Sequence, residues 1–340
     1  MPIDLRSDTV TQPTAAMKAA MWEAPLGDDV FEEDPSLNAL EQKAAKLFGH
    51  ESALFCPSGT MTNQIAIRVH TQPGQEVLCD ELSHIYHYEG GGIAVNSLAS
   101  VRLLKGDRGR ITVDDIAANI NPDDIHFPVS SLVSLENTCN KGGGCCYDWK
   151  TVEAIADFCR SRQLGLHLDG ARLFNALVAT DTAPATVGPW FDTISICLSK
   201  GLGAPAGSLL LGTHATIKKA RRVRKVLGGG MRQAGLLAAA GSYALDHHVH
   251  RLAEDHDRAK QLGSTLTRCA LVRKVLPVET NIVVFELTHP AEVDATRQRM
   301  EAEGLRSVPF GAGKIRLVTH LDFNDDQLTE TTAILKKCLN

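Results

Sequence analysis

The sequence has 340 residues, with 35 basic and 40 acidic side chains and a formal net charge of −5. Hydrophobic residues make up 44% and charged residues 22%, which is ordinary for a globular protein and excludes collagen-like, disordered and disulfide-scaffold classes. The acidic balance and the lack of a long basic stretch exclude nucleic acid as an expected partner. A chain of this length predicts about two domains.

Targeting and redox signals indicate a cytoplasmic protein. The nine cysteines show neither a zinc-ribbon spacing nor a CxxC pair, so we expect reduced thiols and no metal site. The first ten residues contain acidic side chains and no apolar core, so they do not form a signal peptide. The longest uncharged stretch, residues 201–217, is broken by Pro205 and several glycines and predicts no membrane span.

The first helix signal lies between residues 34 and 49. Asp34 and Pro35 form an N-cap followed by a proline in the first helical position, and Gly49 provides the C-terminal stop. Leu37, Leu40, Ala44 and Leu47 between them recur at helical spacing and predict one apolar face.

Short apolar runs follow, with helical patterns such as residues 149–162 between them. They lie at residues 76–79, 101–104, 131–135, 164–168 and 193–198. Each run is too short and too continuous for an amphipathic helix and is typical of a buried parallel strand. The alternation predicts a large, doubly wound α/β domain with a mostly parallel sheet.

The C-terminal third has a different pattern. A long helical stretch over residues 233–269 is followed by a strand at 281–287, a helix at 291–303, a strand at 314–319 and a last helix after Asp325. This order predicts a smaller α+β domain. We therefore divide the chain into a large domain over residues 1–245, with the N-terminal arm included, and a small domain over residues 246–340.

Ligands of doubly wound sheets bind at the carboxyl ends of the strands, so polar residues that follow the apolar runs are candidates. The first candidate is the turn Ser58-Gly59-Thr60, which opens a helical segment at 62–69. Backbone N–H groups at a helix start, with two hydroxyls beside them, suit a phosphate. A plain helix cap needs the same residues.

The second and third candidates each follow a predicted strand. Asp169 ends the run at 164–168, where a carboxylate needs a cation, either a protonated pyridine nitrogen or Arg172. Lys200 follows the run at 193–198, where loss of solvation favours the uncharged amine that forms a Schiff base. A lysine that extends to the solvent is the alternative.

Together the three candidates match what pyridoxal 5′-phosphate requires of a protein. A lysine forms the Schiff base, a carboxylate keeps the ring nitrogen protonated so that the ring accepts electrons, and a loop holds the phosphate. The separation of 31 residues between Asp169 and Lys200 (200 − 169) leaves room for a helix and a strand.

Segments along nearly the whole chain resemble the low-specificity L-threonine aldolases, in the threonine aldolase and β-eliminating lyase family of fold-type I pyridoxal-phosphate enzymes. The matching segments are DLRSDTVT at 4–11, PSGTMTN at 57–63, SHI at 83–85, LENT at 135–138, HLDGAR at 167–172, SKGLG at 199–203, GGGMRQ at 228–233 and RLVT at 316–319. The set is highly specific, whereas DGAR or SxKG alone is not.

The resemblance implies a role for each matching position. The cofactor-binding residues that it implies are Ser58, Gly59, Thr60, His84, Asp169, Lys200 and Arg232. Among them, Lys200 resembles the Schiff-base lysine, Asp169 the partner of the pyridine nitrogen, and His84 the histidine that stacks on the ring. The turn at 58–60 resembles the phosphate-binding loop.

The resemblance also implies substrate and subunit contacts. Ser7, Arg172 and Arg316 resemble the residues that bind the substrate carboxylate, and His126 resembles a second histidine near the substrate hydroxyl. Lys225 and Arg232 resemble basic residues that reach the site of a neighbouring subunit. Members of the family are usually homotetramers, dimers of dimers with sites at a subunit interface.

The implied reaction is that of a carbon–carbon lyase, an aldehyde-lyase. It is a retro-aldol cleavage of L-threonine, L-allo-threonine and related β-hydroxy-α-amino acids to glycine and an aldehyde, here acetaldehyde. Lys200, His84 and His126 are the expected catalytic residues. The base is left open among His84, His126 and an ordered water, because a histidine titrates near neutral pH but His84 is also expected to stack on the ring.

The sequence departs from the family pattern at one position, and three other functions are considered beside the aldolase. Family members often carry a histidine where Cys139 stands, which puts the chemistry of the following glycine-rich turn in doubt. A β-eliminating lyase acting on an aromatic amino acid is the nearest alternative. An NAD(P)-binding oxidoreductase is more distant, because the GxGxxA match at 201–206 runs into a strand-like segment. The histidines at 247–256 do not converge on one helix face as metal ligands would.

Overall fold

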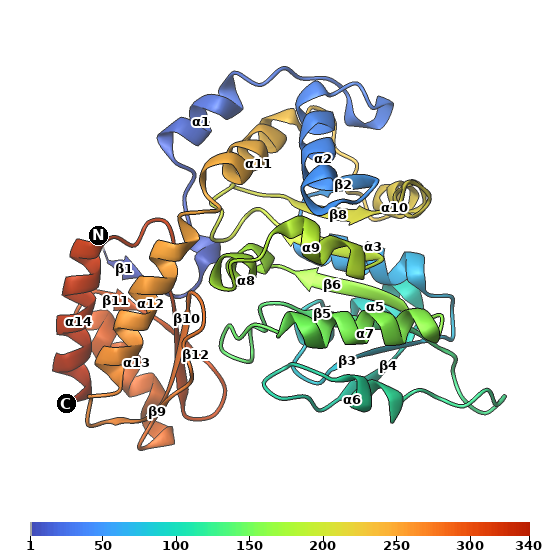
Figure 1. The fold of residues 1–340 in the computed structure, drawn as a ribbon. Coiled ribbons are helices and arrows are strands. Elements are labelled where there is room, and N and C mark those ends of the chain that lie inside the picture. The colour runs from blue at the N-terminus through green and yellow to red at the C-terminus, as the bar shows by residue number, and fades with distance from the viewer. Residues whose placement is uncertain (1) are drawn as a thin grey trace.

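The computed structural model describes residues 2–340, and the larger part of the chain is built around a seven-stranded sheet (Figure 1). In order across the sheet the strands are β2 (Ser52–Cys56), β8 (Ser208–Gly212), β7 (Thr193–Cys197), β6 (Gly165–Gly170), β5 (Ser130–Glu136), β3 (Glu76–Asp80) and β4 (Ser100–Leu104). Only β8 runs antiparallel to its neighbours. The five predicted strands and the mostly parallel sheet are confirmed.

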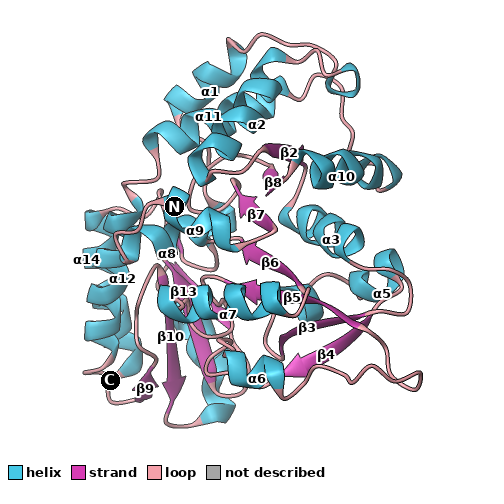
Figure 2. Ribbon diagram, turned by 45° about the vertical axis from the view of Figure 1, so that its right-hand side comes forward, coloured by secondary structure: helices cyan, strands magenta, loops and turns pink. Residues whose placement is uncertain are grey.

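Helices cover both faces of this sheet, as a doubly wound fold requires (Figure 2). One face carries α3 (Gly59–His70), α5 (Gly92–Ser97) and α10 (His214–Val226). The other carries α6 (Val113–Ala117), α7 (Trp149–Ser161) and α9 (Pro184–Val187). The strands are almost continuously apolar because both of their faces are buried.

The remaining helices of the large domain lie around the sheet edge and the strand ends. They are α1 (Ala15–Trp22), α2 (Pro35–Phe48), α4 (His84–His87), α8 (Leu173–Ala179) and α11 (Gly235–His247). The predicted start of α2 is confirmed, since the Asp34 side chain accepts a hydrogen bond from the backbone of Leu37. Its end is confirmed by Gly49, which has a φ of 70°.

A second, antiparallel sheet forms the core of the C-terminal part. Its strand order is β12 (Val308–Pro309), β13 (Lys314–Val318), β10 (Ile282–Leu287) and β9 (Val272–Val275), and α12 (Leu252–Leu266), α13 (Val293–Ala302) and α14 (Asp325–Leu339) complete the unit. This is the predicted α+β arrangement.

Residues 3–5 of the N-terminal arm, which is predicted to be part of the large domain, pack against the C-terminal unit. β1 (Ile3–Asp4) pairs in parallel with β11 (Leu305–Arg306), and Ile3 and Leu5 are buried in the apolar cluster of the C-terminal unit. Its position in the sequence predicts that the arm is part of the large domain, but its apolar side chains pack beside the second sheet. The C-terminal unit is therefore built from both ends of the chain.

The predicted long helix over residues 233–269 is instead two helices. α11 ends at His247 and α12 begins at Leu252, and between them Nδ1 of His248 donates a hydrogen bond at 2.7 Å to the carbonyl oxygen of Leu202. α11 packs on α1 and α2, whereas α12 packs on α14 and β10, so the chain passes from one unit to the other at this break. The predicted division at 245/246 lies next to it and stays a prediction.

Among residues 2–340, no helix combines the length and the apolar character that crossing a membrane requires.

Candidate active site

Three polar side chains lie side by side where the central parallel strands end. Glu136 of β5 pairs in register with Asp169 of β6, and Asp169 pairs with Ser195 of β7. All three are buried. Because the strands are parallel, their carboxyl ends meet at one sheet edge, which is where a doubly wound fold binds its ligand.

The Asp169 carboxylate is held on both oxygens. Oδ1 accepts a hydrogen bond from the backbone N–H of Ala171 at 3.1 Å, and Oδ2 accepts one from Nδ2 of Asn63 on α3 at 2.9 Å. Asn63 in turn contacts the buried ring of His167 through Oδ1 at 3.2 Å. Asn63 therefore fixes the orientation of Asp169, a role that a single residue in a helical pattern did not signal.

A second buried carboxylate, Glu89, organises the His84 side of the site. Oε1 of Glu89 lies 3.0 Å from Nδ1 of His84 and accepts a hydrogen bond from Nδ2 of Asn63 at 2.8 Å. Polar atoms of His84, Glu89 and Asp169 all lie within 4.8 Å of one another. Burial disfavours the charged His84 ring, but the hydrogen bond to Glu89 and the charge of Asp169 outweigh it and raise the pKa of His84.

Glu136 adds a third carboxyl group to this part of the site. Its Oε2 accepts a hydrogen bond from the backbone N–H of His84, and its Oε1 accepts one from that of Asn140, both at 2.8 Å. Burial and the neighbouring charge of Asp169 raise the pKa of Glu136 to about 7. Three carboxyl groups so close together favour a cationic ligand, and a protonated pyridine ring is one that fits.

The predicted phosphate loop opens α3. The Ser58 hydroxyl accepts a hydrogen bond from the backbone of Met61 at 3.2 Å, so Ser58 is the N-cap of the helix. A Cβ atom added to Gly59 would lie 3.5 Å from Oγ of Ser208 and 3.8 Å from Sγ of Cys197. The loop therefore lies close to the ends of β7 and β8. The turn at residues 58–60 can therefore cap the helix and also bind a phosphate, so the two interpretations are compatible.

Lys200 follows β7 by three residues and lies beside the segment after β6. It lines a small recess together with Gly170, Ala171 and Arg172. Among residues 2–340, its amine has neither an ion-pair nor a hydrogen-bond partner. The GxGxxA segment that starts at Gly201 leads into β8 and not into a helix, which rules out the dinucleotide-binding arrangement.

Arg172 is already paired within the chain. Its Nε and Nη2 donate to the two oxygens of Asp8, each at 2.7 Å, and both side chains are almost completely buried. Nδ2 of Asn281 donates to the same carboxylate at 3.2 Å. Burial alone would raise the pKa of Asp8, but the charge and hydrogen bonds of Arg172 lower it to about 2. Only Nη1 of Arg172 is left for a substrate.

Arg316 is the better candidate for a carboxylate. It stands on β13, where Nη1 donates to Oδ1 of Asn140 at 2.8 Å and Nη2 donates to the carbonyl oxygen of Arg6 at 3.1 Å. Its Nε is buried and has no hydrogen-bond partner among residues 2–340. Burial and the charge of Arg172 lower the pKa of Arg316 to about 10. Within residues 2–340 no carboxylate pairs with this guanidinium, so it is a candidate to bind an anion.

Ser7 lies next to Asp8, at the N-cap of the turn over residues 8–10. Its hydroxyl accepts hydrogen bonds from the backbone N–H and the hydroxyl of Thr9, at 3.3 and 2.9 Å. The N-terminal arm thus brings Ser7 to the same region as Arg172 and Arg316.

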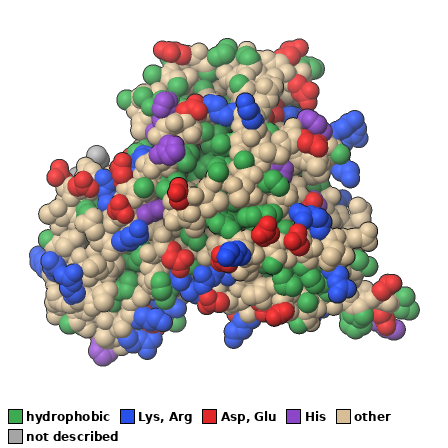
Figure 3. All heavy atoms as spheres, in the orientation of Figure 1, with side chains coloured by type: hydrophobic (Ala, Val, Ile, Leu, Met, Phe, Trp, Pro, Cys, Tyr) green, Lys and Arg blue, Asp and Glu red, His purple; other side chains and the backbone are tan. Residues whose placement is uncertain are grey.

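The structure does not bring His126 to the site of its own chain. Its side chain is 78% exposed, and Nδ1 pairs with Asp124 at 2.6 Å. The loop that carries it leads into the amino end of β5, whereas the site lies at the carboxyl ends. This loop projects at the lower right of Figure 1, and Figure 3 shows apolar, acidic and histidine side chains at that corner.

The two basic residues predicted to reach a neighbouring subunit lie on the surface. Lys225 is exposed near the end of α10. The side chain of Arg232 is 60% exposed and pairs with Asp28 at 3.2 Å. Neither contacts the predicted cofactor residues of its own chain.

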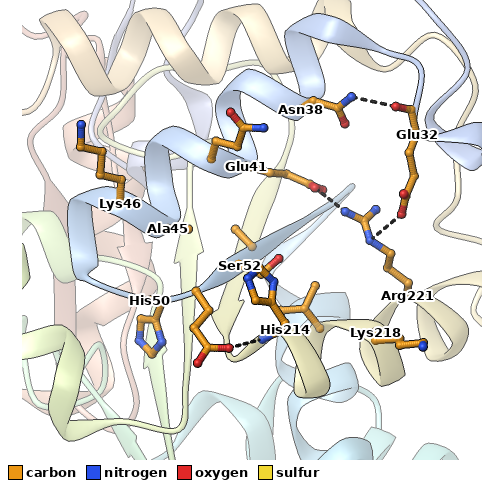
Figure 4. A pocket seen from close by; sticks show the side chains of 14 residues that line it. Glu32, Asn38, Glu41, Ala45, Lys46, His50, Ser52, His214, Lys218 and Arg221 are labelled. Carbon is orange, nitrogen blue, oxygen red and sulfur yellow. Dashed lines mark hydrogen bonds and ion pairs between the residues drawn. The ribbon is translucent and has the colours of Figure 1, made fainter.

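A separate cavity of about 840 Å³ lies between α2, β2 and α10 (Figure 4). Its charged side chains neutralise one another, since Arg221 pairs with Glu41 at 2.6 Å and with Glu32 at 3.4 Å. None of the predicted site residues lines it. Size alone therefore does not locate the chemistry of this protein.

Comparisons with known proteins agree with the predicted family. The beta-eliminating lyase family matches residues 4–289. The chain is 44% identical to the low specificity L-threonine aldolase of Escherichia coli K12 over 97% of both chains. It is 40% identical to a probable low-specificity L-threonine aldolase of Arabidopsis thaliana, over 95% of this chain and 93% of the relative. The solved threonine aldolase of Leishmania major matches all of both chains with a TM-score of 0.85 at 23% identity.

The Asp8–Arg172 pair generates a prediction about stability. Asp8→Asn leaves a buried guanidinium without a countercharge, and we expect a loss of about 3 kcal/mol of unfolding free energy at neutral pH. The pKa of Asp8 in the folded protein, about 2, is below its ordinary value of 3.8. The contribution of the ion pair to the free energy of unfolding is therefore fully present above about pH 4 and is lost as the pH falls through 2.

Thermal melts of the wild type and Asp8→Asn between pH 7 and pH 2.5 test this. The gap between their melting temperatures should narrow as the pH falls. Asp157→Asn, which breaks an exposed ion pair on α7, is the control and should stay close to the wild type. Equal melting temperatures for all three proteins at pH 7 would contradict the prediction.

Proposed function

This chain belongs to the beta-eliminating lyase family and, within it, to the low-specificity L-threonine aldolases, and from that premise we propose how its residues carry out the reaction. The protein is a pyridoxal 5′-phosphate-dependent carbon–carbon lyase that cleaves L-threonine, and with it L-allo-threonine, to glycine and acetaldehyde. The observation that carries the assignment is that Asp169 and Lys200 both lie at the carboxyl ends of neighbouring strands of the large sheet, Asp169 on β6 and Lys200 just after β7.

The residues at the strand ends fit the cofactor. The Lys200 amine would hold its aldehyde carbon, Asp169 would hold the proton on its ring nitrogen, and the N–H groups at 58–60 would bind its phosphate. The cofactor supplies an electron sink for the bond that breaks. Asn63 and Ala171 keep the Asp169 carboxylate in one orientation, which keeps the ring nitrogen charged.

Arg316 orients the substrate. Its Nε is free, and its two terminal nitrogens are already fixed by Asn140 and by the backbone of Arg6, so the guanidinium offers a carboxylate a rigid donor. A fixed carboxylate also fixes rotation about the neighbouring bonds, including the Cα–Cβ bond that must break. Ser7 is the second proposed contact. Arg172 contributes mainly by holding Asp8 and by its charge beside Arg316.

His84 is the proposed proton carrier of this chain. Glu89 occupies Nδ1, so Nε2 is the nitrogen that can take the proton of the substrate β-hydroxyl. Its raised pKa also means that a larger share of the ring is charged near neutral pH, and a charged ring cannot act as a base. His84 can still cover the cofactor ring, with an ordered water taking the proton. His126 has no part in this chain's own site.

We propose further that the protein is a cytoplasmic homotetramer with sites at subunit interfaces, within reach of Lys225 and Arg232. Exposed apolar side chains support self-association, among them Trp22, Phe31, Ile125 and Val226. The nine cysteines form no disulfide within residues 2–340, which supports a reducing compartment.

The first test concerns Lys200. Lys200→Ala should lose the visible absorption of the bound cofactor and lose activity, because no other amine replaces it, whereas Lys150→Ala on the exposed face of α7 should keep both. The wild type should convert threonine to glycine and acetaldehyde. Pyruvate and ammonia as products would instead indicate β-elimination. A wild type without visible absorption after added pyridoxal phosphate would refute the proposal.

The second test concerns Arg316. Arg316→Ala should raise KM for threonine sharply, about 100-fold if the carboxylate contact is worth about 2.7 kcal/mol. It should also lower kcat, because carboxylate binding aligns the reacting bond. Steady-state kinetics measure both, with Arg160→Ala on α7 as the control. Normal kinetics in Arg316→Ala would remove this residue from the substrate site.

The third test concerns assembly. Sedimentation velocity of the wild type should show a tetramer, and Ile125→Asp should shift the population to smaller species because the exposed apolar loop tip then carries a charge. Lys150→Asp is a surface control of similar charge change. A wild type that sediments as a monomer at all concentrations would contradict the proposed assembly.

A further inference from the structure

Cys139 and Cys145 face each other across a short antiparallel bridge beside the candidate active site. The backbone N–H of Cys139 donates to the carbonyl oxygen of Cys145 at 3.0 Å, and that of Gly144 donates to the carbonyl oxygen of Cys139 at 2.9 Å. Paired residues of antiparallel strands have Cα atoms roughly 4.5–5.5 Å apart, within the range of roughly 4.4–6.8 Å that disulfides need.

The two thiols also influence each other, since the interaction between them raises the pKa of Cys139 and lowers that of Cys145. We propose that Cys139 and Cys145 are a dithiol that hydrogen peroxide oxidises to a reversible disulfide, and that this disulfide weakens the binding of the amino-acid carboxylate. The second half of the proposal depends on the proposed function, and the first half does not.

Cys145 is the sulfur that reacts first. The neighbouring Cys139 thiol, together with the charges of Arg108 and Arg110, lowers the pKa of Cys145 despite its burial. Burial instead raises the pKa of neighbouring Cys146 to about 12. Since the thiolate is the nucleophile, peroxide selects Cys145. Both cysteines are buried, so a small oxidant such as hydrogen peroxide is expected to react with them more readily than a bulky disulfide.

The chemistry balances in two steps. The Cys145 thiolate attacks one peroxide oxygen, so an S–O bond forms, the O–O bond breaks, and hydroxide leaves and takes up a proton as water. Cys139 then attacks the sulfur of the resulting sulfenic acid. An S–S bond forms, the S–O bond breaks, and the hydroxyl group leaves as water with the Cys139 proton. The two thiols lose two electrons, and the peroxide is reduced to two waters.

The turn between the two cysteines connects them to the substrate site. The Cys139 thiol donates to the carbonyl oxygen of Glu136 at 3.0 Å. The next residue, Asn140, donates through its backbone to the Glu136 carboxylate and accepts from Nη1 of Arg316, both at 2.8 Å.

A disulfide brings the sulfurs to about 2.05 Å, closer than any hydrogen-bonded contact. Cys139 must then leave the Glu136 carbonyl oxygen, and Asn140 moves with it. We therefore expect oxidation to displace the group that fixes Arg316, with an effect on carboxylate binding and a smaller effect on the bond-breaking step.

The first experiment maps the disulfide in the holoenzyme without substrate. The protein is exposed to hydrogen peroxide, quenched with an alkylating reagent and digested, and its peptides are analysed by mass spectrometry. We expect a linked Cys139–Cys145 peptide that dithiothreitol removes. Cys146→Ser, which changes the adjacent buried thiol, should keep the link, and Cys145→Ser should abolish it.

Two outcomes of the mapping would overturn the proposal. One is full alkylation of both cysteines after peroxide has oxidised other thiols of the folded protein. The other is a linked peptide that persists in Cys145→Ser. If Cys145→Ser does not fold, Cys139→Ser tests the same link from its other sulfur.

The second experiment measures kinetics before and after oxidation. KM for threonine should rise about tenfold in the oxidised wild type, as expected for the loss of one hydrogen bond to a charged group, and should return with dithiothreitol. KM of Cys145→Ser should not respond to peroxide. A mapped disulfide with unchanged KM would refute the effect on the carboxylate, whereas an enzyme without aldolase activity would leave the thiol mapping intact and refute the proposed function instead.

Discussion

The buried ion pair between Asp8 and Arg172 joins the parts of the molecule that make the site. Asp8 comes from the N-terminal arm, Arg172 follows β6 of the large sheet, and Asn281, which also binds the carboxylate, precedes β10 of the second sheet. The two hydrogen bonds of one bidentate contact and a third donor, Asn281, offset the cost of removing these charges from water. The pair also determines which of the two arginines, Arg172 or Arg316, is available to bind a substrate. With Arg172 neutralised by Asp8, Arg316 is the arginine of this region that has no carboxylate partner within residues 2–340, and it is the one proposed to bind the substrate carboxylate.

The site is electrically divided. Glu89, Glu136 and Asp169 make its inner part acidic, while Arg316 and Lys200 make its outer part basic. Such a division suits the proposed ligands, because the carboxylates would hold a protonated pyridine ring and the arginine would hold the substrate carboxylate. His84 belongs to the acidic part of the site. Its backbone is bound by Glu136 and its ring by Glu89, so the charge of the inner part directly governs its proton.

Local patterns in the sequence were sufficient to predict individual helices and strands, but not which other elements they pack or pair with. Asp34, Pro35 and Gly49 carry their own capping chemistry and predicted α2 correctly, and the apolar runs predicted the central strands. The break at 248–251 has no proline or glycine to signal it, because it results from the chain crossing between two units. Similarly, β1 is defined by its partner β11, some 300 residues away (305 − 3 = 302), and nothing local indicates that pairing.

The site residues likewise fall into those that a local sequence pattern predicted and those that it did not. Asp169 and Lys200 were predicted because each directly follows a strand, whereas Asn63, Glu89 and Glu136 act through contacts that only the folded chain creates. His126 was expected from resemblance alone, and its loop precedes β5 where the site requires a residue that follows a strand.

The register of the sheet explains why so many separate segments act as one unit. Glu136, Asp169 and Ser195 are paired directly across three parallel strands, so the same backbone hydrogen bonds that hold the sheet also set the spacing of the polar groups. Side chains alternate between the two faces of a strand, so a slip of one residue in β6 would turn Asp169 away from Asn63 and His84 and bury its charge elsewhere. The continuous apolar character of the strands resists such a slip only weakly, because both faces are apolar. The polar contacts at the strand ends therefore also stabilise the fold. Asn63 on α3 and the backbone of Ala171 can bind Asp169 in one strand register only. The contacts that build the site thus also fix the register of the sheet.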